Sequence, residues 1–193
     1  YQSALRSITY VNTSDNPSLA TRTVSFVVND GSANSNTGMR NISVAAVNDA
    51  PVVTSNGGGA TAAVSVAENQ TAVTTVASTD VDGGAAVYSI VGGADQAMFS
   101  IDSATGALTF NTAPNFESPS DVGGNNVYDV MVQVADGNGG SDTQAIAVTV
   151  TNVNEAPVIT SSATVNAAEN QTAAITITST DVDGGAPSYS IVG

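Results

Sequence analysis

The chain has 193 residues, a formal net charge of −14, three basic side chains and no His or Cys. This composition excludes a nucleic-acid partner, because phosphate contacts need Lys and Arg, and it excludes attraction to an anionic membrane surface. Without thiol, imidazole or lysine amine, catalytic triads, Schiff bases and zinc sites are not expected, so we predict that the chain is not an enzyme.

Short segments in which apolar and polar residues alternate follow one another through the middle of the chain. A period of two predicts half-buried strands, and Gly-, Asn- and Asp-rich connections separate them. Seven strands are expected, at Ala62–Val66, Val73–Ala77, Val87–Val91, Met98–Ile101, Ala107–Phe110, Val127–Val134 and Gln144–Val150. Seven strands in about a hundred residues predict an all-β fold, a Greek-key β-sandwich. No run of about 18 apolar residues is present, so direct membrane insertion of this fragment is not expected.

The sequence repeats itself. "ENQTA" at Glu68–Ala72 recurs 101 residues later, and so does "STDVDGGA" at Ser78–Ala85. "VNDAPV" at Val47–Val52 returns 106 residues later as "VNEAPV". The difference of five residues is assigned to an insertion around Gly57–Gly59, which is expected to be flexible. Fixed-offset repetition of this kind indicates a tandem array of similar units.

The repeat divides the chain into three parts. We predict the C-terminal part of one sandwich at 1–50, a complete sandwich at 51–156 and the N-terminal part of a following one at 157–193. Pro51 and Pro157 lie at the boundaries, where Pro can end a strand and stiffen the crossing. The chain is expected to be a fragment of a longer tandem array.

Carboxylates gather at the ends of the predicted strands. Residues 41–193 hold fifteen carboxylates and no cationic side chain, and an unpaired buried charge is very costly, so a bound cation is the remaining way to balance them. Oxygen ligands alone favour a hard cation such as Ca²⁺. The Asp80 loop is not an EF-hand, because Gly84, Ala85 and Val91 occupy positions that need Asp or Asn, Gly and Glu. Taken alone, Asp-x-Asp favours a solvated turn over a metal site.

Taken together, the motifs resemble the cadherin repeat, specifically the bacterial cadherin-like domains of large surface proteins. In order, they are "AEN", "TDVDGG" followed by "YSI", "FSIDSATGALTF", "NFE", "VQVADGNGG" and "NVNEAP". The chain departs from the family pattern at Ala67, Asn115, Asn152, Glu155 and Ala156. Six motifs in the family's order are specific, although each one alone is weak.

The resemblance implies Ca²⁺ between successive units, held by two residue sets. The downstream junction, between 51–156 and 157–193, would use Glu68, Glu117, Asn154, Glu155, Asp181 and Asp183. The upstream junction, between 1–50 and 51–156, would use Asn48, Asp49, Asp80, Asp82 and Asp136. The first part has no Glu where Glu117 stands in the complete unit, so the two junctions should be unequal and fewer ions per junction are expected than in animal cadherins. The alternative for these carboxylates is a solvated, solubilising role.

The leading hypothesis is a calcium-rigidified extracellular repeat module of a bacterial cell-surface adhesin. Cell adhesion is implied by the resemblance, and homophilic adhesion by the family alone. Its partners would be neighbouring cadherin-like domains of the same chain, with a cell-surface protein or glycan as a further partner. One alternative is a carbohydrate- or protein-binding β-sandwich, for which Tyr1, Tyr10 and Tyr128 are the candidate exposed aromatics. Another is a passive spacer in a multidomain secreted protein.

Two further expectations concern packing. The terminal parts should lie at opposite poles of the complete unit, with open sheet edges and less packing than residues 51–156. The remaining carboxylates are interpreted as surface or turn residues, namely Asp95, Asp102, Asp121, Asp129 and Asp142.

Overall fold

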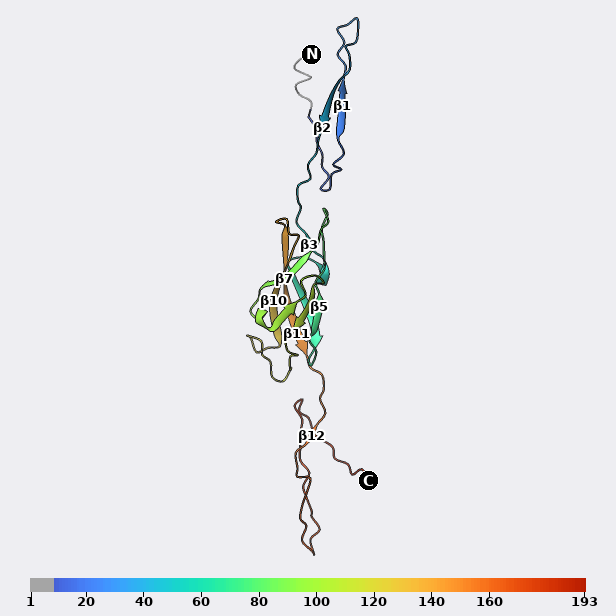
Figure 1. The fold of residues 1–193 in the computed structure, drawn as a ribbon. Coiled ribbons are helices and arrows are strands. Elements are labelled where there is room, and N and C mark those ends of the chain that lie inside the picture. The colour runs from blue at the N-terminus through green and yellow to red at the C-terminus, as the bar shows by residue number, and fades with distance from the viewer. Residues whose placement is uncertain (1–8) are drawn as a thin grey trace.

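The computed structural model describes residues 9–193, so Tyr1 lies outside the described part. Three parts follow one another along a line, with a compact body in the middle and thin extended segments above and below it (Figure 1). We call these the first part (residues 9–50), the central unit (51–156) and the last part (157–193). The predicted placement of the terminal parts at opposite poles matches this arrangement.

The first part is a single hairpin. β1 (Arg22–Phe26) pairs antiparallel with β2 (Gly38–Ile42). By the repeat offset these strands correspond to the last two strands of the central unit. Of residues 9–50 only Pro17 is buried, so this hairpin has no core of its own.

The central unit is built from three small sheets. The largest has the order β4 (Thr61–Ala67), β11 (Ser141–Thr151), β10 (Val127–Ala135), β7 (Val87–Gly92). A second has the order β5 (Ala72–Thr75), β9 (Ala107–Phe110), β8 (Phe99–Ile101). A third pairs β3 (Val52–Val53) with β6 (Ser78–Thr79). Two short 3-10 turns, η1 (Ser55–Gly57) and η2 (Gln96–Met98), complete it. The predicted all-β sandwich is confirmed.

Two details differ from the predicted strands. The strand expected at Val73–Ala77 is divided, because β5 pairs with β9 whereas β6 leaves that sheet to pair with β3. β3 itself was not predicted, since two residues are too few to show a period. β4 runs parallel to β11, a relation between distant segments that alternation within either strand does not reveal.

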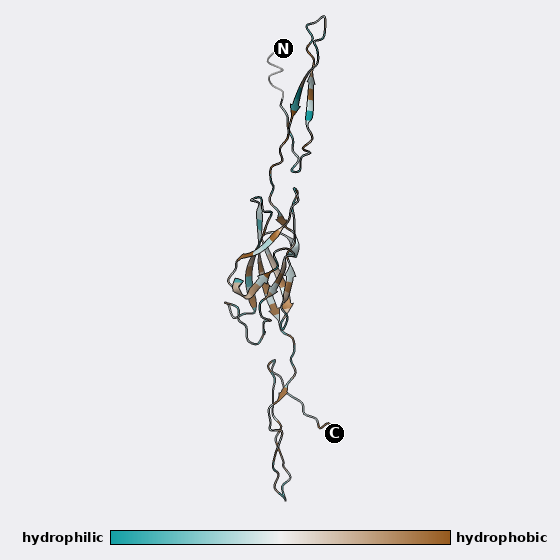
Figure 2. Ribbon diagram, in the orientation of Figure 1, coloured by the Kyte–Doolittle hydropathy of each residue, from teal (hydrophilic) through white to brown (hydrophobic). Residues whose placement is uncertain are grey.

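The core lies between the sheets of the central unit, where Figure 2 concentrates its hydrophobic colour. Alternate residues of β10 and β11 face it: Tyr128, Val130, Val132, Val134, Ile146, Val148 and Val150 are buried. Phe110 packs against Phe99 with ring centroids 4.6 Å apart and edge-on against Tyr128 at 5.1 Å. All buried hydrophobic residues of the described chain lie between Val53 and Val150.

The insertion around Gly57–Gly59, which the sequence predicts to be flexible, is hydrogen-bonded to a buried side chain of this core. Gln144 on β11 is fully buried. Its side-chain amide donates to the carbonyl oxygens of Ser55 at 3.3 Å and Gly59 at 3.1 Å, and its oxygen accepts from Asn56 at 3.3 Å. A buried amide placed in this way satisfies its own polar atoms and fixes the loop.

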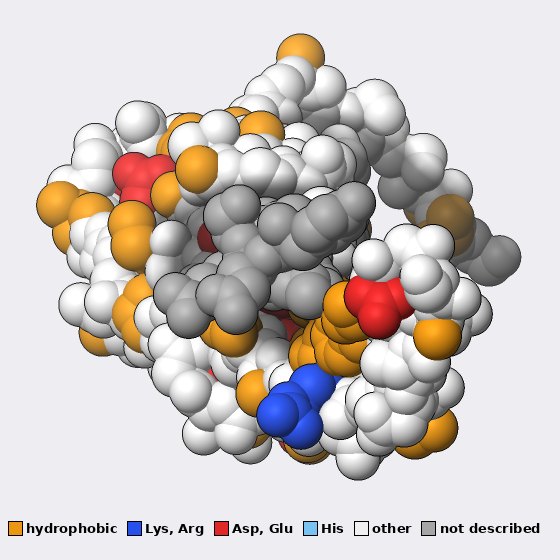
Figure 3. Space-filling view, turned by 90° about the horizontal axis from the view of Figure 1, so that it is seen from above, with side chains coloured by type: hydrophobic (Ala, Val, Ile, Leu, Met, Phe, Trp, Pro, Cys, Tyr) orange, Lys and Arg blue, Asp and Glu red, His pale blue; other side chains and the backbone are white. Residues whose placement is uncertain are grey.

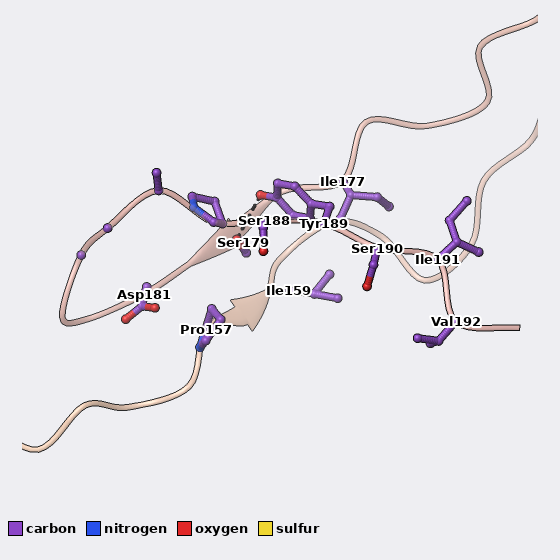
Figure 4. Close-up of a pocket in the computed structure, with 14 residues that line it drawn as sticks. Pro157, Ile159, Ile177, Ser179, Asp181, Ser188, Tyr189, Ser190, Ile191 and Val192 are labelled. Atoms are coloured by element: carbon purple, nitrogen blue, oxygen red, sulfur yellow. Dashed lines mark hydrogen bonds between the residues drawn. The ribbon is translucent and has the colours of Figure 1, made fainter.

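The last part repeats the opening of the central unit. β12 (Val158–Ile159) pairs with β13 (Ser179–Thr180) in the register of β3 with β6. A cavity of about 900 Å³ opens beside this pair, and Figure 4 shows Ile159, Ile177, Tyr189 and Ile191 around it. By the repeat offsets these four residues correspond to Val53, Val76, Tyr88 and Ile90, which contribute to the central core.

Within residues 9–193 no helix is long and apolar enough to cross a membrane.

Candidate metal sites at the two junctions

Glu68 is the most buried carboxylate of the downstream junction. It directly follows β4, and the whole residue is 1% exposed. One oxygen accepts the backbone N–H of Phe116 and the other that of Val153, both at 2.8 Å. Because these donors lie 48 and 85 residues away, Glu68 joins the end of β4 to the loop before β10 and to the linker after β11.

Glu117 and Glu155 lie beside Glu68 and leave buried oxygens without a donor. One oxygen from each of the three side chains lies within 4.8 Å of the others. Oε1 of Glu117 accepts from Asn152, and Oε1 of Glu155 accepts from Asn69, each at 2.8 Å. Oε2 of both residues is buried and has no hydrogen-bond partner. A buried carboxylate oxygen without a partner is costly.

Burial and neighbouring carboxylates disfavour the ionised form of Glu117 in this cluster. Burial raises the pKa of Glu117, and the charges of Glu68, Glu155 and Asp183 raise it further. The described basic side chains, Arg22 and Arg40, both lie in the first part. Basic side chains are sparse, as the small blue area in the view along the long axis in Figure 3 illustrates.

The last part contributes its Asp-x-Asp turn to the same place. Oδ2 of Asp183 accepts the backbone N–H of Glu155 at 2.5 Å, and Oδ1 accepts from Asn152 at 2.8 Å. These two donors lower the pKa of Asp183. Oδ1 of Asp181 accepts the backbone N–H of Asp183 at 3.1 Å. Asn154 donates to the carbonyl oxygen of Glu155 at 2.8 Å and so fixes the linker conformation.

The donor set of the downstream junction fits a hard divalent cation. Every candidate ligand is an oxygen, which suits Ca²⁺ and does not suit Zn²⁺, whose preferred ligands are Cys and His. The orphaned Oε2 atoms of Glu117 and Glu155 are what a cation between them would satisfy. Residues Glu68, Glu117 and Glu155 would hold it, with the linker and the Asp181–Asp183 turn beside them.

At the upstream junction, Asn48 of the linker contacts the central unit directly. Its amide donates to Oδ2 of Asp136 at 2.6 Å. Oδ1 of Asp136 accepts the backbone N–H groups of Asn138 and Gly140. The Asn48 amide and these backbone donors lower the pKa of Asp136. A Cβ added at Gly140 would lie 2.8 Å from Cα of Ala50, so the absence of a side chain lets the linker approach.

Asp49, Asp80 and Asp82 form the second half of the upstream junction. The backbone N–H of Asp49 donates to Oδ2 of Asp82 at 2.6 Å, and that of Asp82 donates to Asp80 at 2.9 Å. This repeats the bonds made by Glu155, Asp183 and Asp181 downstream. Burial raises the pKa of Asp49, followed by the charges of Asp82, Asp15 and Asp80.

A comparison with protein families gives a match within the central unit. Residues 62–154 match the cadherin domain. The match spans all seven strands predicted for that unit, from Ala62 to Val150. No curated protein matches the chain.

Solved structures with the cadherin fold resemble the chain. They include human CDH23 EC21-23 (TM-score 0.57, 18% identity, 86% of this chain and 55% of that one). Protocadherin Gamma B7 extracellular cadherin domains 1-4 give a TM-score of 0.54 at 23% identity, with 86% and 41% covered. Protocadherin Gamma B2 domains 3-6 give 0.50 at 24%, with 66% and 32% covered. The chain thus spans about a third to about half of these structures, and at such identities the likeness establishes the cadherin fold.

Sequence reasoning missed four polar residues at the junctions. Asp15 acts on Asp49 through its charge, and the neighbouring Asn16 donates to the Val81 carbonyl oxygen at 3.0 Å. The sequence signal for Asp15 is its place in "SDNP", just after the position of the first part that corresponds to Glu117 and lacks Glu. In the sequence, Asn152 stands out only as a departure from the cadherin motif, and Asn69 only as part of the repeated "ENQTA". Amides that pair with carboxylates across a junction leave no spacing pattern.

Outside the junctions, two carboxylates and one aromatic differ from expectation. Asp95 and Asp121 are buried and organise loops through backbone N–H groups, so of the two predicted roles, surface or turn, they have the turn role. Asp102 accepts three hydrogen bonds within its own turn, from Ala104 and Thr105. Tyr128, predicted as a candidate exposed aromatic, is 1% exposed, because its ring belongs to the core.

Proposed function

We propose that this chain is a calcium-rigidified segment of an extracellular, cell-surface adhesive protein, in which Ca²⁺ at each junction stiffens the succession of cadherin units. The observation that carries the proposal is the pair of buried, unpartnered oxygens of Glu117 and Glu155 beside Glu68. They lie at the pole of the central unit that meets the next unit. The cadherin family consists of non-enzymatic adhesion domains, which supports a structural role.

The proposal assigns one cation site to each junction and retains the boundaries at 50/51 and 156/157. The downstream site comprises Glu68, Glu117, Asn154, Glu155, Asp181 and Asp183. The upstream site comprises Asn48, Asp49, Asp80, Asp82 and Asp136, and we add Asp15 to its surroundings. A bacterial surface location of the parent protein belongs to the same proposal.

The physical consequence is a calcium-dependent hinge. With the cation bound, carboxylates from two units share one positive centre and the linker is held between them. After its removal, like charges at each junction repel and the linker bends. Extracellular calcium modules typically bind at about 10⁻⁴ to 10⁻³ M, so occupancy belongs outside the cytosol.

The test is small-angle X-ray scattering of the whole chain under two conditions. One contains calcium at about 2 mM, which is on the order of the expected dissociation constant, and the other contains a chelator. We expect a larger maximum dimension and a narrower distance distribution with calcium. Glu117→Gln, which removes one charge from the site, should reduce that response. Asp129→Asn removes a charge from an exposed position and should leave it intact. Identical scattering of the wild type in both conditions would refute the hinge.

A glycan-binding function receives less support from the described aromatics. Tyr128 is buried, and the ring of Tyr10 has the guanidinium of Arg22 over it at 5.7 Å from the centroid. Sugar rings stack on free aromatic faces, and Arg22 covers one face of the Tyr10 ring. We therefore do not advance carbohydrate binding, and a purely passive spacer would give no response to calcium in the scattering test.

A further inference from the structure

Asn152 occupies an unusual position in the downstream junction. It lies in the linker after β11, and its side-chain nitrogen donates to two carboxylates at once. These are Oε1 of Glu117 and Oδ1 of Asp183, both at 2.8 Å. Glu117 belongs to the central unit and Asp183 to the last part. A single neutral group therefore ties together acids from two successive units.

An amide that donates to two carboxylates holds them together, as a cation between them would. An amide nitrogen carries two N–H donors and no charge, and hydrogen bonds to ionised acceptors are stronger than those between neutral groups. By placing one N–H on each carboxylate, Asn152 holds them together where their charges alone would drive them apart. Both oxygens of Asp183 are then used, because Glu155 donates its backbone N–H to the other.

Two buried carboxylate oxygens of this junction are left without a donor. With Glu68 satisfied by two backbone donors and Asp183 by its two partners, Oε2 of Glu117 and Oε2 of Glu155 remain buried and unpartnered. These two oxygens are what the protein's own donors leave available to a cation. At the upstream junction the position that corresponds to Asn152 is Ala46, so this bridge is particular to the downstream junction.

We propose that the Asn152 amide takes the place of a bridging cation between Glu117 and Asp183, so that the downstream junction retains more of its geometry at low calcium than the upstream junction does and binds fewer ions than its acid count suggests. Only the expectation that fewer ions bind rests on the proposed calcium function. The amide bridge itself concerns the chain without calcium. Asn152 is a positioning residue that acts through the two carboxylates.

The experiment compares the wild type with Asn152→Asp and Asn152→Ala in the whole chain. Asn152 is exposed, so neither change disturbs the core. Spin labels at Ala113→Cys and Thr176→Cys report the distance across the junction by pulsed electron resonance, and the chain has no native Cys to interfere. Asn36→Asp, exposed in the loop between β1 and β2, is the matched control for an Asn-to-Asp charge change.

In chelator, we expect the narrowest distance distribution for the wild type and Asn36→Asp, a broader one for Asn152→Ala and the broadest for Asn152→Asp. Calcium should narrow the Asn152→Asp distribution again. Calorimetric titration should show calcium binding to Asn152→Asp tighter by on the order of tenfold, or with one more ion, because a ligand charge has been added.

Two results would overturn the inference. Equal distributions of the wild type, Asn152→Asp and Asn152→Ala in chelator would show that the amide bridge does not hold the junction. Equal calcium affinity and ion number of the wild type and Asn152→Asp would show that the amide does not occupy a ligand position. A wild type that binds no calcium at all would instead defeat the proposed function, and the chelator comparison would still decide on the bridge.

Discussion

Asp95 illustrates how single carboxylates outside the junctions hold this molecule together. It is 4% exposed, and its two oxygens accept the backbone N–H groups of Val122 at 2.7 Å and Asp129 at 2.8 Å. The side chain thereby joins the turn before η2 to the loop before β10 and to β10 itself. Its charge is balanced by backbone dipoles, since residues 41–193 contain no basic side chain.

Asp95→Asn should therefore lower the free energy of unfolding by about 1–3 kcal/mol, because one of the two backbone donors would face an NH₂ group and lose its acceptor. Urea unfolding followed by circular dichroism measures this. Asp129→Asn makes the same chemical change at an exposed site on β10 and should stay within about 0.5 kcal/mol of the wild type. Equal losses for both variants would contradict the role of Asp95.

The contribution of Asp121 to the stability of the fold depends on pH. Burial raises its pKa, but the backbone N–H groups of Asn125 and Asn126 outweigh this, and the pKa is lowered from 3.8. A carboxyl with a lowered pKa in the folded state stabilises the fold above its unfolded pKa, and this contribution is lost as the pH falls through the folded value.

The stability difference between the wild type and Asp121→Asn should accordingly be full at about pH 6 and shrink below about pH 4. Urea unfolding of both proteins across this range measures the difference. If the difference stays constant down to about pH 2.5, the ionised form of Asp121 does not carry the stabilisation.

At the scale of elements, the β8–β9 turn shows why a Gly is required at one position. Gly106 has φ +72°, and an added Cβ would collide with the carbonyl oxygen of Val76. That contact is close because the backbone N–H of Val76 donates to the Gly106 carbonyl oxygen at 2.8 Å. The turn thus lies directly against the strand that crosses from β5 to β6.

Gly106→Ala should cost about 2–4 kcal/mol, because left-handed strain and a backbone collision act together. Gly124→Ala is the matched control: its φ is +61°, and an added Cβ would meet nothing within 4 Å. That change should cost only about 1 kcal/mol. Thermal and urea unfolding compare the two, and similar costs would mean that the packing of the turn against Val76 is unimportant.

The strands differ in how well alternation along the sequence predicts them. Alternation located β10 and β11 to within a few residues, because one face of each is fully buried. It missed β3 and the break at Val76, since both depend on which sheet a strand joins. The buried Gln144 gave no signal either, because a polar residue at a core position makes sense only when Ser55 and Gly59 are seen opposite it.

At the scale of the whole molecule, core packing is concentrated in the central unit. The first part contributes one buried residue and the last part none among the described residues. In the last part, the side chains that correspond to central core residues instead line an open cavity of about 900 Å³. Paired strands without a packed face are weakly stabilised.

Native-state hydrogen exchange should therefore show amides of β1 and β2 exchanging faster than those of β10 and β11, on the order of a hundredfold or more. The comparison is internally matched, because β1 and β2 correspond to β10 and β11 by the repeat. β12 and β13 should likewise exchange faster than β3 and β6. Equal protection of corresponding strands would contradict the difference in packing.

The sequence alone determined the period of the array, the strand positions and the all-β class, because these depend on local alternation and on fixed repeat offsets. Among the residues predicted for the junctions, the tertiary structure places one oxygen each of Glu68, Glu117 and Glu155 within 4.8 Å of one another. Only the tertiary structure decided what each carboxylate does. The partners of Glu68 lie 48 and 85 residues away, and Asn152 meets Glu117 and Asp183 across a junction. Burial and hydrogen-bond partners depend on which distant segments the fold brings into contact, and the spacing of residues along the sequence does not encode these contacts.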